Sequence, residues 1–308
     1  MITEILLLIL GFVLLVRGAD VFVDAAAGIA RKFKIPAIII GTTIVAIGTS
    51  APEAAISIIA ALKGADGVSV GNVIGSNITN IFLILGVTAA IGTIPVHKNT
   101  KKYELPFVGF ITLLLAIFGL TLGQISRGAA IILLALFVAF LIYMIIMARK
   151  SDDVPDDIKP VSLGAGAVLI IAGIAALVYG SNMVVDSATA IAQHVGVSDR
   201  VIGLTLIALG TSLPELVVCI IAAIKRQYDL AIGNIVGSNI FNILFVLGMA
   251  AAIRPIPFQI AFLTDTAVAL GAIAMLILFT YRGSKLTRIG GIVFLLSYIA
   301  YTAYLVIE

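Results

Sequence analysis

Two glutamates, Glu53 and Glu215, lie in matching segments of otherwise apolar sequence. The first segment reads GTTIVAIGTSAPE and ends at Glu53, and the second reads GLTLIALGTSLPE and ends at Glu215. A carboxylate deep in apolar surroundings is costly, so such a residue is by default a candidate functional residue. Two of them, in matched copies of a broken hydrophobic segment, predict an ion-binding site.

The proline in each motif predicts a break in a helix. Pro52 lacks an N–H and its ring clashes with the carbonyl four residues earlier, while Gly48 adds backbone freedom nearby. The break is expected to free carbonyls around Ala46 to Thr49, and a hard cation can bind their oxygens together with the Glu53 carboxylate. Further oxygens come from Thr49 and Ser50 in the first copy, and from Glu215, Thr211, Ser212 and the carbonyl region at Ala208 in the second.

The two motifs are expected to form one site, because pseudo-twofold symmetry would bring the breaks face to face near the middle of a membrane. Two carboxylates in one dry site repel each other. One divalent cation cancels both charges, and so do two monovalent cations. The two kinds of ion should therefore compete, and protons should compete with both, so acid is expected to weaken calcium binding.

A second repeated motif, GNxxGSNxxN, is predicted to form the walls of this site. It runs from Gly71 to Asn80 and again from Gly233 to Asn242. Its glycines have the small-xxx-small spacing that lets helices approach closely. Ser76 and Asn80 share a helix face, as do Ser238 and Asn242, and these side chains offer neutral oxygens. Two interpretations stay open for the asparagines, namely direct site walls or hydrogen bonds between helices; Asn72, Asn77, Asn234 and Asn239 could instead satisfy freed backbone groups.

The composition indicates a helical membrane protein without a soluble domain. Hydrophobic residues make up 61% of the chain and charged residues only 11%, far from the roughly 25% charged residues of soluble domains. The net charge of +3 comes from scattered loop residues, which argues against nucleic-acid binding, and the single Cys219 excludes an intrachain disulfide. The first apolar run follows Glu4 rather than a basic segment, so we interpret it as a span and not as a signal peptide.

Short polar segments divide the chain into about ten apolar stretches that are long enough to span a membrane. They are predicted near 3–30, 36–62, 68–94, 103–122, 127–148, 163–190, 198–225, 230–253, 258–280 and 288–307.

The duplication defines the predicted domains: residues 1–150 as a first five-helix repeat, 151–162 as a linker and 163–308 as a second repeat. An odd number of spans per repeat inverts the second copy. Lys and Arg gather in alternate loops, and the positive-inside rule then places the 151–160 linker in the cytoplasm and both termini outside.

Several charged residues outside the motifs are interpreted as structural or solvated rather than as part of the ion site. Arg17, Asp20 and Asp24 can pair at helical spacing, so we expect a structural role near the cytoplasmic end of the first span rather than a coupling role, and the same for Asp186. His97 and His194 lack metal-ligand company and are expected to be solvated. Asp265 has no partner visible in the sequence.

These motifs resemble those of the calcium:cation antiporter superfamily, and specifically of its prokaryotic, ten-helix sodium/calcium exchangers. The resemblance spans nearly the whole chain. It implies an all-α membrane fold of two inverted five-helix repeats, electrogenic exchange of sodium for calcium by alternating access, and two peripheral helices that slide across a fixed core. It also implies a site in which Glu53, Glu215, Thr49 and Thr211 bind calcium, Ala46, Ser50, Ser76, Ala208, Ser212 and Ser238 join them for sodium, and Asn80 and Asn242 line the centre.

Two departures qualify the resemblance. Potassium-dependent relatives, and some potassium-independent prokaryotic ones, have an acid at the position of Asn242, and its absence here argues against potassium co-transport. The proton-coupled branch has a Gly-Asn pair in place of Thr-Ser.

The sequence thus predicts a sodium/calcium antiporter of the cell membrane that works as a monomer, needs no cofactor and is not an enzyme. A proton/calcium exchanger of the same fold and a passive cation channel are the alternatives.

Overall fold

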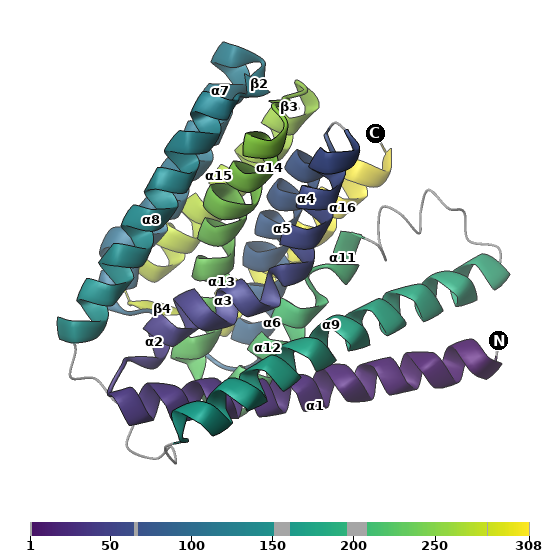
Figure 1. Ribbon diagram of the computed structural model, residues 1–308, viewed down its shortest axis with the longest axis vertical. Coiled ribbons are helices and arrows are strands. Elements are labelled where there is room, and N and C mark those ends of the chain that lie inside the picture. The colour runs from purple at the N-terminus through teal and green to yellow at the C-terminus, as the bar shows by residue number, and fades with distance from the viewer. Residues whose placement is uncertain (1, 65–66, 151–160, 196–207, 282, 308) are drawn as a thin grey trace.

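The computed structural model describes residues 2–64, 67–150, 161–195, 208–281 and 283–307. The predicted linker at 151–160 and the start of the predicted span 198–225 lie outside these ranges. Within them the chain is helical apart from short strands and connections (Figure 1). The elements of the first half are α1 (Ile2–Phe33), α2 (Ala37–Ile40), η1 (Gly41–Val45), α3 (Ala46–Thr49), α4 (Ala51–Lys63), α5 (Val68–Thr79), η2 (Asn80–Ile84), α6 (Leu85–Ile91), β1 (Ile94–Pro95), η3 (Thr100–Glu104), α7 (Leu105–Leu122), β2 (Gln124–Ile125) and α8 (Arg127–Lys150).

The second half repeats this order. Its elements are α9 (Leu163–His194), α11 (Ala208–Gly210), α12 (Leu213–Ile224), α13 (Tyr228–Phe241), η5 (Asn242–Leu247), α14 (Gly248–Ile253), β3 (Ile256–Pro257), α15 (Ala261–Tyr281), β4 (Lys285–Leu286) and α16 (Arg288–Ile307). The elements labelled η are π-helical turns, which occur mostly as local bulges in α-helices and often at functional sites.

Eight described helices are long and apolar enough to cross a membrane, and the bent pair of 37–49 with α4 makes a ninth. The described part of the remaining predicted span is α11 and the shorter apolar helix α12. The fold therefore agrees with about ten spans, and it confirms an all-α membrane architecture.

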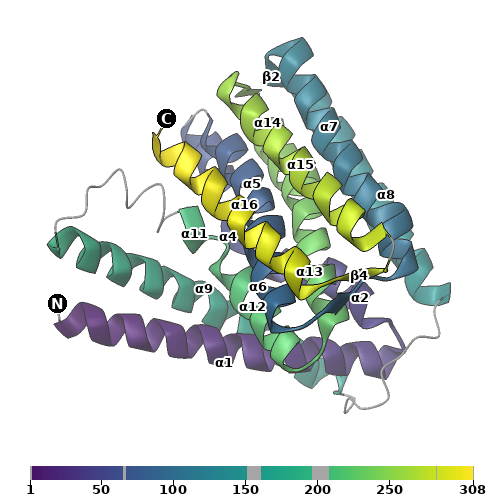
Figure 2. The same cartoon turned by 180° about the vertical axis from the view of Figure 1, so that it is seen from behind.

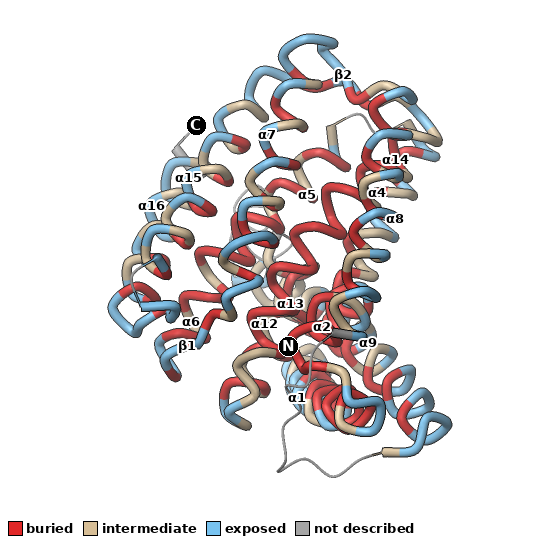
Figure 3. The backbone as a smooth tube through the Cα atoms, turned by 90° about the vertical axis from the view of Figure 1, so that its left-hand side faces the viewer, coloured by how far each residue is buried: buried red, intermediate tan, exposed pale blue. Residues whose placement is uncertain are grey.

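The helices form a buried central layer and an outer layer that covers it. α5 with η2 and α6, and α13 with η5 and α14, lie in the buried middle of the molecule (Figure 3). α7, α8, α15 and α16 cover them, and many exposed residues of these four helices are large and apolar. Such an exposed apolar surface suits hydrocarbon rather than water. The central layer is thus shielded from lipid by the outer helices.

The long helices α1 and α9 pack side by side in opposite directions across one flank of the bundle (Figures 1 and 2). The face that they share is lined by buried small residues, Gly11 and Gly18 on α1 and Gly173 and Gly180 on α9. Small residues let two backbones approach closely in a membrane. The antiparallel arrangement of these equivalent helices is what an inverted repeat requires.

Two short antiparallel strand pairs tie the halves together at opposite ends of the bundle. β1 pairs with β4, matching Ile94 to Leu286, and β2 pairs with β3, matching Ile125 to Ile256. Each pair therefore joins one strand from each half (Figure 2).

Candidate ion-binding site

The predicted breaks occur at both motifs. The helix axis bends by 48° between 37–49 and α4, and Ser50 and Ser212 share a non-helical conformation, with φ near −82° and −89° and ψ near 13° and 5°. Each following helix has its proline in the first turn, where the missing N–H costs nothing. Glu53 and Glu215 then fall in the first turns of α4 and α12.

The two glutamates meet in one buried site. Each is only 1% exposed. The Ser50 hydroxyl donates to Glu215 Oε1 over 2.7 Å, and the Ser212 hydroxyl donates to Glu53 Oε1 over 3.4 Å, so each half reaches the carboxylate of the other. The Ser76 hydroxyl also donates to Glu53 Oε1, over 3.3 Å.

The site holds oxygen atoms that have no hydrogen-bond partner although they are buried. They are Glu53 Oε2, Glu215 Oε2, Ser238 Oγ, Asn80 Oδ1 and Asn242 Oδ1. A buried polar atom without a partner is costly, so these oxygens require a ligand that accepts their lone pairs. A hard cation meets that need. No cluster of three His, Cys, Asp or Glu residues occurs in the described ranges, so a cation here would rely on two carboxylates and neutral oxygens.

The asparagines form a network that repeats across the pseudo-twofold axis. Asn80 Nδ2 donates to Asn239 Oδ1 over 2.9 Å, and Asn242 Nδ2 donates to Asn77 Oδ1 over 3.1 Å, which is the same contact with the halves exchanged. Asn80 and Asn242 are also the residues at which η2 and η5 begin. The amide groups thus join the halves, which confirms hydrogen bonding between helices for this pair. The Asn80 and Asn242 oxygens stay unpartnered, and their role as walls of the site stays a prediction.

Other asparagines satisfy backbone and hydroxyl groups. Asn72 Nδ2 donates to the Glu53 carbonyl over 3.2 Å and to Ser57 Oγ over 3.0 Å, and Asn77 Nδ2 donates to the Asn239 carbonyl over 3.2 Å. Ser57 was not singled out from the sequence, although its place one helical turn after Glu53 is the signal that could have found it.

The first copy of the motif is closely packed by its surroundings. Thr49 Oγ1 donates to Asn234 Oδ1 over 3.0 Å. The expectation of a free carbonyl at Ala46 is wrong in one respect, because this oxygen accepts the Ser50 N–H over 3.0 Å. The π-helical η1 and the short α3 continue hydrogen bonding up to the break, and the Thr49 hydroxyl also donates to this oxygen over 3.4 Å, so the Ala46 carbonyl is not free.

The second copy is more open. Thr211 is half-buried and lines a cavity of about 350 Å³ beside α5, α15 and α16, together with Gly75 and Ser76. Ala208 begins α11, and residues 196–207 before it lie outside the described part of the chain.

Asp265 lines the same cavity, and it has a hydrogen-bond partner there that could not be seen in the sequence. The Tyr301 hydroxyl donates to Asp265 Oδ1 over 2.9 Å, and the Tyr298 hydroxyl lies 3.4 Å from Thr79 Oγ1. These four residues line the same cavity as Ser76, so its lining includes several polar groups.

The expected pairing of Arg17 with Asp20 and Asp24 is wrong in its partner. Lys225, at the end of α12, lies 2.7 Å from Asp20 Oδ1 and 2.6 Å from Asp24 Oδ1. Burial lowers the pKa of Lys225, but the hydrogen bonds to Asp20 and Asp24 outweigh it and leave the pKa above its ordinary value. Lys225 follows directly on the end of α12, so its ion pairs with Asp20 and Asp24 join α12 to α1. These contacts replace the pairing that was expected within α1.

His97 is likewise not simply solvated, because its Nε2 lies 3.0 Å from Asp229 Oδ1.

Comparison with known proteins places this geometry in a family context. A family model described as sodium/calcium exchanger protein matches residues 3–146 and 165–307. The chain is 31% identical to sodium/calcium exchanger MaX1 of Methanosarcina acetivorans over 97% of each chain, and 41% identical to inner membrane protein YrbG of Escherichia coli over 81% of this chain and 79% of the relative. A solved structure of the sodium-calcium exchanger NCX_Mj matches with a TM-score of 0.86 at 36% identity and covers 98% of both chains.

Proposed function

The chain belongs to the sodium/calcium exchanger protein family, and from this premise we propose that it exchanges sodium for calcium across the cell membrane by alternating access. The observation that carries the proposal is the single buried site in which Ser50 of one half binds Glu215 of the other and Ser212 binds Glu53 in return. Such a site cannot hold two unpaired negative charges in a dry interior. The site therefore needs bound cations, and its two carboxylates set the total positive charge that it binds.

Charge balance explains why the two ions compete. One calcium ion cancels both carboxylates, and sodium ions can do the same with the help of neutral oxygens. We assign calcium to Glu53, Glu215, Thr49 and Thr211. Sodium would use these residues together with Ala46, Ser50, Ser76, Ala208, Ser212 and Ser238, with Asn80 and Asn242 lining the centre. The unpartnered oxygens of Ser238, Asn80 and Asn242 support this assignment.

The described conformation suggests which side the site faces. The cavity beside α5 is lined by Ser76, which is 3% exposed, and by the half-buried Thr211, whereas their equivalents Ser238 and Thr49 are fully buried and do not line it. With both termini outside and the 151–160 linker in the cytoplasm, as the loop charges favour, this cavity faces outward. Residues 1–150 and 163–308 would then exchange roles in the inward-facing state, within a single monomer.

Flux into proteoliposomes tests the proposal. Calcium uptake should require an outward sodium gradient and should be lost in Glu53→Ala and Glu215→Ala. Uptake driven equally well by a pH gradient without sodium would identify a proton/calcium exchanger instead. Large currents without any counter-ion gradient would identify a channel, and either result would overturn sodium/calcium exchange.

A further inference from the structure

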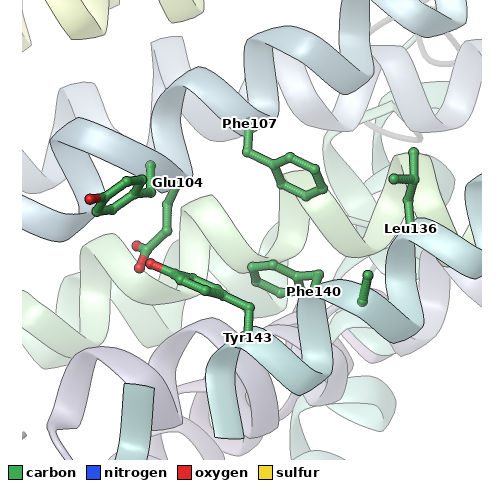
Figure 4. A pocket seen from close by; sticks show the side chains of 7 residues that line it. Glu104, Phe107, Leu136, Phe140 and Tyr143 are labelled. Carbon is green, nitrogen blue, oxygen red and sulfur yellow. The ribbon is translucent and has the colours of Figure 1, made fainter. Parts of the chain in front are cut away.

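A second cavity, of about 320 Å³, lies between α7 and α8 and takes no part in the ion site (Figure 4). It is lined by Tyr103, Glu104, Phe107, Leu136, Ala139, Phe140 and Tyr143. Its walls are aromatic or aliphatic: the Phe107 and Phe140 rings stack with centroids 6.0 Å apart, and Phe140 is followed by Tyr143 at 6.5 Å. Glu104 is the only acid among these lining residues.

The polar atoms at one end of this cavity have no partner. Glu104 is 6% exposed, and its Oε2 makes no hydrogen bond. The Tyr143 hydroxyl is also buried without a partner, and Figure 4 shows the polar ends of these two side chains turned toward one another. Thr100, one helical turn before Glu104, is buried but does not line the cavity. None of the described ion pairs involves Glu104.

The other half shows how an acid at this place can be satisfied from within the chain. α8 begins at Arg127 and α16 at Arg288, and Phe140 and Tyr301 lie the same number of residues after these starts. Glu104 and Asp265 likewise lie the same number of residues before them. Asp265 accepts a hydrogen bond from the Tyr301 hydroxyl. Phe140 has no hydroxyl to donate, so Glu104 lacks the hydrogen bond that Asp265 receives from Tyr301.

The chemistry of the cavity selects the class of ligand. A bare metal ion needs about six oxygen ligands. The polar end of this cavity offers far fewer oxygens, because most of the lining atoms are carbon. A primary ammonium group has three N–H donors that can bind the unpartnered oxygens of Glu104 and Tyr143, and a charged donor makes strong hydrogen bonds to a carboxylate. Aromatic faces attract the same cation. The apolar walls suit a hydrocarbon chain attached to the ammonium group.

We propose that the cavity between α7 and α8 binds a primary ammonium group carried on an apolar chain, with Glu104 as its counter-ion. The ethanolamine headgroup of a membrane phospholipid and a free alkylamine share this chemistry. The headgroup has an additional partner, because the Lys102 ammonium lies over the ring of Tyr103, 5.0 Å from its centroid, and Tyr103 lines the cavity, so that a lipid phosphate can bind this ammonium.

Lipid retention provides the test. The full chain is placed in nanodiscs with equal amounts of phosphatidylethanolamine and phosphatidylcholine of matched acyl chains, and the lipids that stay bound are counted by native mass spectrometry. The ethanolamine lipid should be enriched by about tenfold, as one charge-assisted hydrogen-bond set would give. Glu104→Gln should abolish this enrichment. Phe140→Tyr should also abolish it, because the new hydroxyl supplies the partner that Tyr301 gives to Asp265; this conservative change keeps the test valid if Glu104→Gln folds poorly.

A matched control and a second arm separate the outcomes. Asp265→Asn removes the equivalent acid of the other half and should leave the enrichment unchanged. In nanodiscs of phosphatidylcholine alone, hexylamine should raise the melting temperature of the wild type and not of Glu104→Gln. A response to hexylamine without lipid enrichment would support the site with a free amine as its source. Equal retention of the two lipids together with no response to hexylamine would overturn the proposal, and so would an enrichment that survives both Glu104→Gln and Phe140→Tyr.

Discussion

Helices α5 and α13 carry the same GNxxGSN motif, yet their surroundings differ. On α13 a methyl group at Gly233 would lie 2.5 Å from the Ile38 carbonyl oxygen, and one at Gly237 would collide with the Thr42 carbonyl and lie 2.7 Å from Ala46 Cβ. On α5 a methyl group at Gly75 would meet nothing within 4 Å. Residues 230–241 of α13 are all buried, whereas the cavity opens along α5.

This difference shows that one repeat is packed shut while its copy is open. The glycine face of α13 holds α2 and η1 against it and seals the site on that side. The same face of α5 is packed more loosely, since a methyl group at Gly71 would meet only Phe262, at 3.6 Å, and the cavity along this face is lined by Ser76 and Thr211. Because the sequences match, the reverse arrangement is available to the chain, and alternating access amounts to exchanging these two packings.

The largest expected effect is on chemical accessibility. In a Cys219→Ser background, which gives α12 the residue that α4 has at Ser57, a cysteine is introduced by Ser76→Cys or by Ser238→Cys. A cationic thiol reagent added outside should label the first about 100-fold faster, the ratio that roughly 2.7 kcal/mol of occlusion gives. Equal labelling rates would show that the two walls do not differ in solution.

Acidity should act on both halves alike, because their carboxylates share one site. As the pH falls, protons neutralise Glu53 and Glu215 and displace the cation, so calcium affinity should drop by up to about tenfold per pH unit for each proton taken up. Calcium titrations at several pH values measure this. An affinity that does not change in mild acid would contradict a shared dicarboxylate site.

Methyl groups on the two glycine faces should separate stability from transport. Gly237→Ala should destabilise the described conformation by about 1–3 kcal/mol, the usual cost of overpacking, and thermal unfolding in detergent measures the loss. Gly75→Ala should leave the melting temperature unchanged but slow exchange, because its methyl group would obstruct the closed packing on that side. If Gly75→Ala lowered the melting temperature as much as Gly237→Ala, the comparison would fail.

The smallest effect is expected where α12 meets α1. Lys225→Ala removes the ion pairs with Asp20 and Asp24, whose side chains are 43% and 62% exposed. Exposed pairs contribute only about 0–1 kcal/mol, so stability should change little. Sodium-driven calcium uptake should stay within about twofold of the wild type on the same grounds. A loss of coupling in this variant would assign the three residues a role in transport.

Much of the fold could be predicted because its signals are local. Proline and glycine mark the breaks before Glu53 and Glu215, and apolar length marks the spans. The duplicated segments mark the repeat, and an odd number of spans in each copy predicts its inversion. These features depend on a few neighbouring residues or on a repetition that the sequence itself displays.

The remaining features depend on contacts between distant segments. Matching motifs cannot show that α13 is packed and α5 open, since the sequence is symmetric where the structure is not. The partner of Asp265 lies on α16, and Lys225 reaches α1 from the far half of the chain. The π-helical turns at Asn80 and Asn242 also have no clear local signal.

Calcium binding to single and double variants tests most directly whether the two halves share one site. Isothermal titration should show that Glu53→Gln, Glu215→Gln and the double variant all lose calcium binding to the same extent, because in the proposed site one calcium ion would bridge both carboxylates and the losses could not add. If each single variant kept a calcium ion, and only the double variant lost binding, the two glutamates would serve separate sites and the account would be wrong.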